Sequence, residues 1–98
     1  MVQTGVTIDM GTDGVKDAVD VSVCSTFTVH LVGITGGGSV TIETSLDGGV
    51  TWVALGSAHT TDAVVTVTDL YHMVRVNVGT HKTGAKAYFR RLVSTSQG

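Results

Sequence analysis

The sequence predicts an all-β protein, an antiparallel β-sandwich of the immunoglobulin-like or jelly-roll-like kind with seven to eight short strands. The 98 residues include 18 Val, 16 Thr and 13 Gly. β-Branched side chains favour strands, and Gly favours the turns between them. Apolar and polar residues alternate along most of the chain, and turn signals recur about every ten residues, as in a sandwich. We therefore expect a single domain over residues 1–98.

The first half of the chain predicts four strands. The first strand is expected at 2–8 and ends at the acidic loop 9–14. Valines at alternate positions predict a short strand at 19–24. In the segment 25–34, Phe27, Val29 and Leu31 alternate with Thr and His. After the Gly-rich segment 35–39, which we expect to be a flexible hairpin tip, the fourth strand covers 40–45.

The second half predicts four more strands. The turn at 47–49 leads into a strand at 50–55, and the polar loop 56–62 precedes a strand at 63–67. Alternating valines predict a strand at 71–78, and Phe89, among charged neighbours, predicts the last strand at 85–93. The sequence has no proline, which is one common protection of edge strands. Assembly through an edge is therefore expected, and residues 1–24 are an arm or an edge segment.

The charges are unevenly distributed along the chain. All eight acidic residues lie at or before Asp69, whereas five of the six basic residues follow it. Two interpretations are open: neighbouring strands mix the charges on one surface, or an acidic patch on one subunit meets a basic patch on the next. The candidate interface residues are Lys86, Arg90 and Arg91 in the last strand, and Val2, Val6 and Ile8 in the first.

The clearest motif is Ser45-Leu46-Asp47-Gly48-Gly49-Val50-Thr51-Trp52. It resembles the Asp box of sialidases and related β-propellers, in which it recurs blade by blade. We expect a structural hairpin in which Asp47 accepts hydrogen bonds from turn amides, Gly49 has a positive φ and Trp52 packs beneath the turn. Its structural residues are then Ser45, Asp47, Gly49, Thr51 and Trp52.

Other patterns fit specific chemistry poorly. The acidic residues of 9–20 lack EF-hand spacing, the four His lack zinc spacing, and no helix follows the Gly-rich segment to hold a phosphate. The lone Cys24 lies in an apolar run, as a buried thiol does. No nucleophile, base and acid are suitably spaced. We therefore expect no enzyme, no metal and no cofactor, and neither nucleic acid nor membrane as partner.

Residues 40–89 carry one more resemblance. The segments VTIETSLDGGVTWVALG and YHMVRVNVGTHKTGAKAYFR, separated by a valine-rich strand, resemble small β-sandwich virion proteins of tailed bacteriophages. The resemblance implies a capsid decoration or cement protein that binds the major capsid protein, or another virion protein, at the outer capsid surface after assembly in the host cytoplasm. It also implies a homo-oligomer, with a trimer favoured, but no transferable site residues.

Two alternatives remain open. One is a neck or tail adaptor or a head fibre component, which differs from cement in copy number and symmetry. The other is a module that binds carbohydrate or a host surface, with Trp52, Tyr71 or Tyr88 as the stacking ring. This second alternative requires an aromatic ring exposed beside polar groups.

Overall fold

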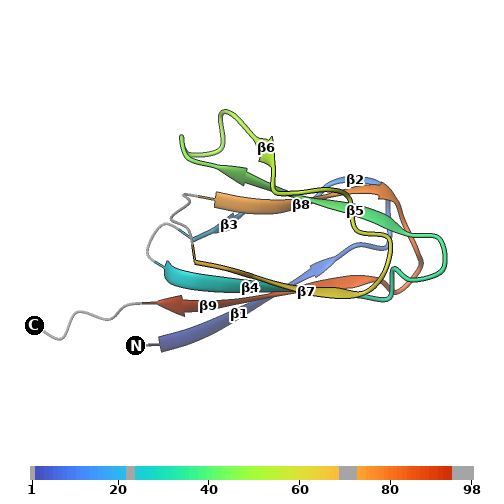
Figure 1. Cartoon of the computed structure of the whole chain (residues 1–98), viewed down its shortest axis with the longest axis horizontal. Helices are drawn as coiled ribbons and strands as arrows, with labels where there is room; N and C mark the ends of the chain where they lie inside the picture. Colours follow the sequence, from blue (N-terminus) through green and yellow to red (C-terminus); the bar gives the residue numbers. More distant parts are fainter. Residues whose placement is uncertain (1, 22–23, 69–72, 94–98) are drawn as a thin grey trace, which may run out of the picture.

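The computed structural model describes residues 2–21, 24–68 and 73–93, and within these ranges it contains nine strands and no helix (Figure 1). The strands are β1 (Val2–Asp9), β2 (Gly14–Val15), β3 (Val19–Asp20), β4 (Cys24–Val32), β5 (Ser39–Ser45), β6 (Val53–Ala54), β7 (Ala63–Val67), β8 (Met73–Thr80) and β9 (Lys86–Val93). The described residues thus include no helix of the kind that crosses a membrane. The predicted antiparallel β-sandwich is confirmed.

The strands form two sheets that pack face to face (Figure 1). One sheet has the order β1-β9-β4-β7, and the other has the order β2-β8-β5-β6, with β3 also paired to β8. Because β5 occupies one side of β8, β2 and β3 pair with its other side and act as one interrupted strand. With β2 and β3 counted together, eight strands have the jelly-roll order rather than the immunoglobulin order.

The core lies between the two sheets and follows the predicted alternation. In β4, Phe27, Val29 and Leu31 are buried, and in β8 Val74, Val76 and Val78 are buried. The facing positions are filled by Val40, Ile42, Ala87 and Phe89. Burial of such side chains is the main stabilising contribution, about 1.5–3 kcal/mol for each large one.

Most connections between the described strands cross from one sheet to the other. The structure differs from the sequence-based expectation in one connection and in the length of one strand. Residues 35–38 do not form a hairpin tip, because β4 and β5 lie in different sheets. The predicted strand at 50–55 shrinks to β6 (Val53–Ala54), because Thr51 takes part in the preceding turn and its amide bonds to Asp47. From the expected strand at 71–78, residues 71–72 lie outside the described part of the chain, as do residues 22–23 of the expected strand at 19–24.

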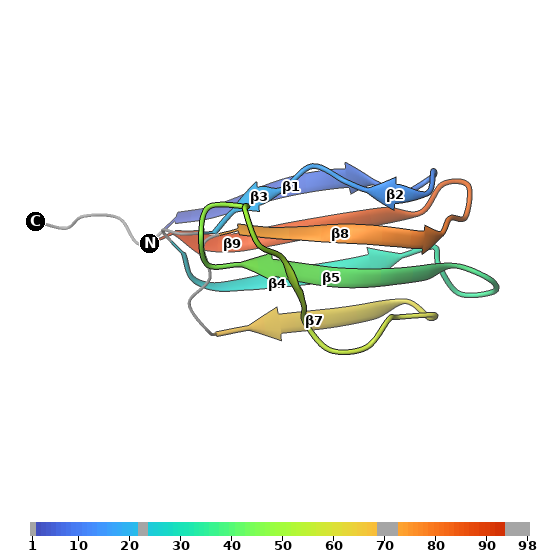
Figure 2. The ribbon, with the colours of Figure 1, turned by 90° about the horizontal axis from the view of Figure 1, so that it is seen from above.

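The edges of the two sheets differ in length. The four-stranded sheet ends in β1, with eight residues, and β7, with five. The five-stranded sheet ends in elements of two residues each, β2 and β3 on one side and β6 on the other. Figure 2 shows β1 alongside β2 and β3 on one side of the sandwich and β7 on the opposite side. Within segment 1–24, β1, β2 and β3 are therefore edge strands.

Candidate functional site

The turn between β5 and β6 contains the motif residues and is closed by side-chain hydrogen bonds. The Ser45 hydroxyl donates to Asp47 Oδ1 at 2.8 Å and accepts from the Gly49 amide at 2.9 Å. Asp47 Oδ1 also accepts from the Thr51 amide at 2.9 Å. Gly49 has φ 93°, a conformation that L side chains rarely adopt. These bonds hold the turn in a single shape.

The electrostatics of Asp47 follow from this geometry. The amide of Thr51 and the hydroxyl of Ser45 stabilise the charged carboxylate and lower the pKa of Asp47 to about 2. The carboxylate is therefore ionised at neutral pH and accepts hydrogen bonds from groups of the same turn. A group used in this way shapes the loop and is poorly suited to proton transfer.

Trp52 is half-buried beneath the turn and has its polar group occupied. Its Nε1 donates to the Gly49 carbonyl at 2.9 Å, and the Arg75 guanidinium lies over its ring at 4.1 Å. Arg75 Nε in turn donates to Glu43 Oε1 at 2.7 Å. Sequence reasoning missed Arg75 and Glu43, which lie opposite each other in β8 and β5. The indole is thus covered on one side by Arg75 and is a poor stacking platform.

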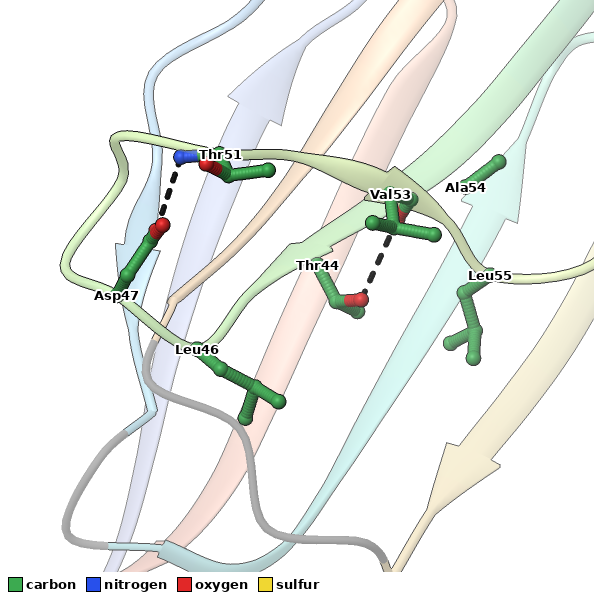
Figure 3. A pocket seen from close by; sticks show the side chains of 7 residues that line it. All are labelled: Thr44, Leu46, Asp47, Thr51, Val53, Ala54 and Leu55. Carbon is green, nitrogen blue, oxygen red and sulfur yellow. Dashed lines mark hydrogen bonds between the residues drawn. The ribbon is translucent and has the colours of Figure 1, made fainter.

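An apolar pocket of about 400 Å³ lies beside this turn (Figure 3). Leu46, which follows β5, and Leu55, which follows β6, border it from the two arms of the hairpin. The remaining lining residues are Thr44, Asp47, Thr51, Val53 and Ala54. Leu46, Val50 and Val53 are 72%, 83% and 63% exposed. The hairpin therefore combines a fixed backbone with exposed apolar side chains.

The predicted basic interface lies on the outer face of the four-stranded sheet. Lys86 Nζ lies 3.6 Å from Asp9 Oδ1, so its charge is directed to the neighbouring strand β1. Arg90 is exposed on the same face of β9. Val6 and Ile8 are half-buried and pack against the core. The side chains of Val2 and Arg91 lie outside the described part of the structure, as does that of Cys24.

An aromatic side chain is exposed on this same outer face. Tyr88 is 44% exposed, and its ring centroid lies 6.2 Å from that of His30 at a tilt of 55°. Thr7 and Val64 extend this row across β1 and β7. Of the three aromatic residues considered for stacking, Tyr88 is exposed, Trp52 is half-buried and Tyr71 lies outside the described ranges.

The acidic residues of the first loop fasten backbone segments together. Asp9 Oδ1 accepts from the Gly11 amide at 2.8 Å, and this bond, with Lys86, lowers the pKa of Asp9. Asp13 Oδ1 contacts both His81 Nδ1 at 2.7 Å and the His81 amide at 2.9 Å, which lowers the pKa of Asp13. Within the described ranges no three His, Cys, Asp or Glu side chains are placed to hold a metal ion.

Asp62 plays a similar part at the crossing from β4 to β5. Its Oδ1 accepts from the amides of Ile34 at 2.9 Å and Thr35 at 3.2 Å. The amides of Gly33 and Ile34 lower the pKa of Asp62 to about 2. No local sequence pattern predicts the contact of Asp62 with the amides of Thr35 and Ile34, because these residues lie 27 and 28 positions away.

The charges that are separated along the sequence are mixed in space. β1 pairs with β9, and β5 pairs with β8, so acidic residues of the first half lie beside basic residues of the second. Asp9 with Lys86 and Glu43 with Arg75 are examples among the described residues. For these residues the charge-mixing interpretation is correct.

No protein-family model matches this chain, and no curated protein matches it. Among solved structures, one similar chain belongs to Bacillus endospore appendages, which are described as a novel family of disulfide-linked pili. That chain is 20% identical to this one, and the superposition covers 95% of this chain and 88% of that chain with a TM-score of 0.44.

Proposed function

We propose that this protein is a structural subunit that acts through protein–protein contacts, as a capsid decoration or cement protein on the outer surface of a phage particle. The observation that carries the proposal is the hairpin of β5 and β6, where Leu46, Val50 and Val53 are exposed on a turn held by side-chain hydrogen bonds. A rigid apolar projection loses little conformational entropy on docking and buries its surface against a partner.

Cement of this kind would stabilise a capsid without chemistry. Each added interface contributes cohesion once it buries about 1,000 Å² or more in total. The partner surface at the hairpin, on the major capsid protein or another virion protein, is then expected to be apolar. A neck or tail adaptor would use the same contacts at a different copy number, and the number of copies per particle separates the two.

The test measures binding to capsids assembled from the major capsid protein that the same genome encodes. The double variant Leu46→Ser, Val50→Ser is expected to bind at least about tenfold more weakly, because two apolar side chains no longer leave water. The control is Val15→Ser, which removes a side chain that is 49% exposed on β2. Wild-type affinity in the double variant, or no binding by the wild type, contradicts the proposal.

A second function has one observation in its favour. Tyr88 is exposed beside His30 and Thr7, and an aromatic ring with polar neighbours is the arrangement that stacks on a sugar. If the protein binds carbohydrate, a glycan array gives hits that Tyr88→Ala abolishes and Leu46→Ser, Val50→Ser leaves unchanged. An array without hits removes this candidate.

A further inference from the structure

We propose that a second copy of this chain binds along β7, through antiparallel pairing of the two β7 strands about a two-fold axis. This contact would join the four-stranded sheets of two subunits into one continuous sheet, and it makes a dimer where the resemblance implies a trimer. It lies on a different element from the hairpin discussed above and does not depend on capsid binding.

β7 itself lacks the sequence features that usually prevent edge pairing. Among the described residues, β7 pairs with β4 on one side and with no strand on the other. Its sequence, AVVTV, has no charge, no proline and no glycine. Edge strands are normally kept from pairing by charged residues or proline, by bulges or by being very short. Of the two sheets, the five-stranded one does end in very short elements.

The sequence of β7 suits pairing with itself. In a two-fold antiparallel pair centred on Val65, Ala63 lies opposite Val67 of the second copy, and Val64 lies opposite Thr66 of the second copy. Because side chains alternate between faces, the inward residues of one copy then meet inward residues of the other. The outer face pairs Val with Thr, both of which favour strands. No like charges are brought together.

Side-chain burial supports the same edge. Val65 packs against the core but is half-buried, and Val64 is 62% exposed on the outer face. A strand beyond β7 would cover both residues from the side. The hydroxyl oxygens of Thr66 and Thr28 of β4 lie 3.1 Å apart, so the row of side chains on the outer face continues to the edge strand. The added strand would extend this row.

Charge disfavours the opposite side of the sandwich as a self-contact. There, β1 lies alongside β2 and β3 (Figure 2), and the exposed residues include Asp9, Asp13, Asp17 and Asp20. A two-fold contact would bring these carboxylates toward their own copies, and like charges in an interface are repulsive. Lys86 and Lys16 offset part of this charge, but the acidic residues outnumber them. This side is therefore the less favourable self-contact, whereas β7 carries no charge.

The experiment compares two substitutions at opposite ends of one cross-strand row. Thr7, Tyr88, His30 and Val64 lie side by side across β1, β9, β4 and β7. Both Thr7 and Val64 are exposed on edge strands, so each tolerates Lys in the monomer. Sedimentation velocity of the full chain is measured over a range of concentrations for the wild type, Val64→Lys and Thr7→Lys.

The wild type is expected to pass from one to two chains of 10.1 kDa as the concentration rises. Val64→Lys is expected to weaken this association at least tenfold, and Thr7→Lys is expected to leave it unchanged. A wild type that stays monomeric, a trimer, or an association lost only in Thr7→Lys overturns the proposal. Each of these results is independent of whether capsids bind the protein.

A crosslink tests the register. Residues directly opposite in an antiparallel pair have Cα atoms about 4.5–5.5 Å apart, within the disulfide range. In a Cys24→Ser background, Val65→Cys is expected to form an interchain disulfide under mild oxidation. Val64→Cys, which faces Thr66 of the second copy, is the matched control and is expected to crosslink far less. Equal crosslinking of the two, or none by Val65→Cys, overturns the register centred on Val65.

Discussion

The two sheets of this sandwich share a core and each has a regular central ladder, but their edges are built differently. In the four-stranded sheet, β9 pairs with β1 over eight consecutive residues and with β4 over a similar length. In the five-stranded sheet, β2, β3 and β6 have two residues each. There, carboxylate and hydroxyl groups bond to backbone amides and fix the adjoining turns. A long segment of alternating apolar and polar residues forms a strand that pairs along its whole length. Where the alternation is interrupted, the chain conformation depends on hydrogen bonds from individual polar side chains.

The largest effect is expected in the regular sheet. Phe89→Ala empties a fully buried position at the centre of β9, and such truncations cost about 3–5 kcal/mol. Tyr88→Ala, one residue earlier on the exposed face, is the control and is expected to cost much less. Urea unfolding of both variants makes the measurement. Equal losses would mean that the outer face carries as much stability as the core.

The next effect is expected at the crossing between the sheets. A Cβ on Gly38 would lie 2.8 Å from the Ile34 carbonyl oxygen and 2.9 Å from Ile34 Cβ, so Gly38→Ala forces a shift that costs roughly 1–3 kcal/mol. At Gly79 the nearest atom, the Ser39 carbonyl oxygen, is 3.6 Å away, and Gly79→Ala is expected to be nearly neutral. Thermal unfolding compares the two, and similar melting temperatures would contradict the close approach at Gly38.

Acid is expected to act mainly on the turns. The folded-state pKa values of Asp47 and Asp62 are lowered to about 2, below the ordinary value of 3.8. Their contribution is therefore fully present above about pH 4 and is lost as pH falls toward 2. Asp47→Asn and Asp62→Asn are expected to lower the melting temperature at pH 7, with a deficit that shrinks between pH 4 and pH 2. A deficit that stays constant with pH would contradict this origin.

The smallest effect is expected at the outer face of the five-stranded sheet. Arg75→Gln removes the guanidinium above Trp52, a contact worth about 0.5–1 kcal/mol where exposed and somewhat more when half-buried. It also removes the charge that pairs with Glu43, which adds to this cost. Trp52 emission is expected to shift to the red, because water reaches the ring that Arg75 covered. Lys82→Gln, in a loop remote from Trp52 in the sequence, is the control and is expected to leave the emission unchanged. An unchanged spectrum in Arg75→Gln would mean that the cation does not cover the indole in solution.

Local alternation predicted much of the fold, but not the pairing of its strands. In β4, β5 and β8 the buried residues are those expected, because alternation with a period of two is a local property. The pairing of Val2 with Val93 is not local, and nothing near either residue encodes it. The predicted strand at 50–55 was too long, since an apolar run cannot reveal that the Thr51 amide bonds to Asp47. The contacts of Asp62 with Ile34 and of Asp13 with His81 were missed because the partners lie 28 and 68 residues apart in the sequence.

The position of β9 has a consequence for synthesis of the chain. This strand lies between β1 and β4, yet it follows the other eight described strands in the sequence. Until residue 93 has left the ribosome, β1 and β4 each present an unpaired edge, and Phe89 is missing from the core. The nascent chain is therefore expected to be sensitive to proteases and prone to association until its final strand is inserted.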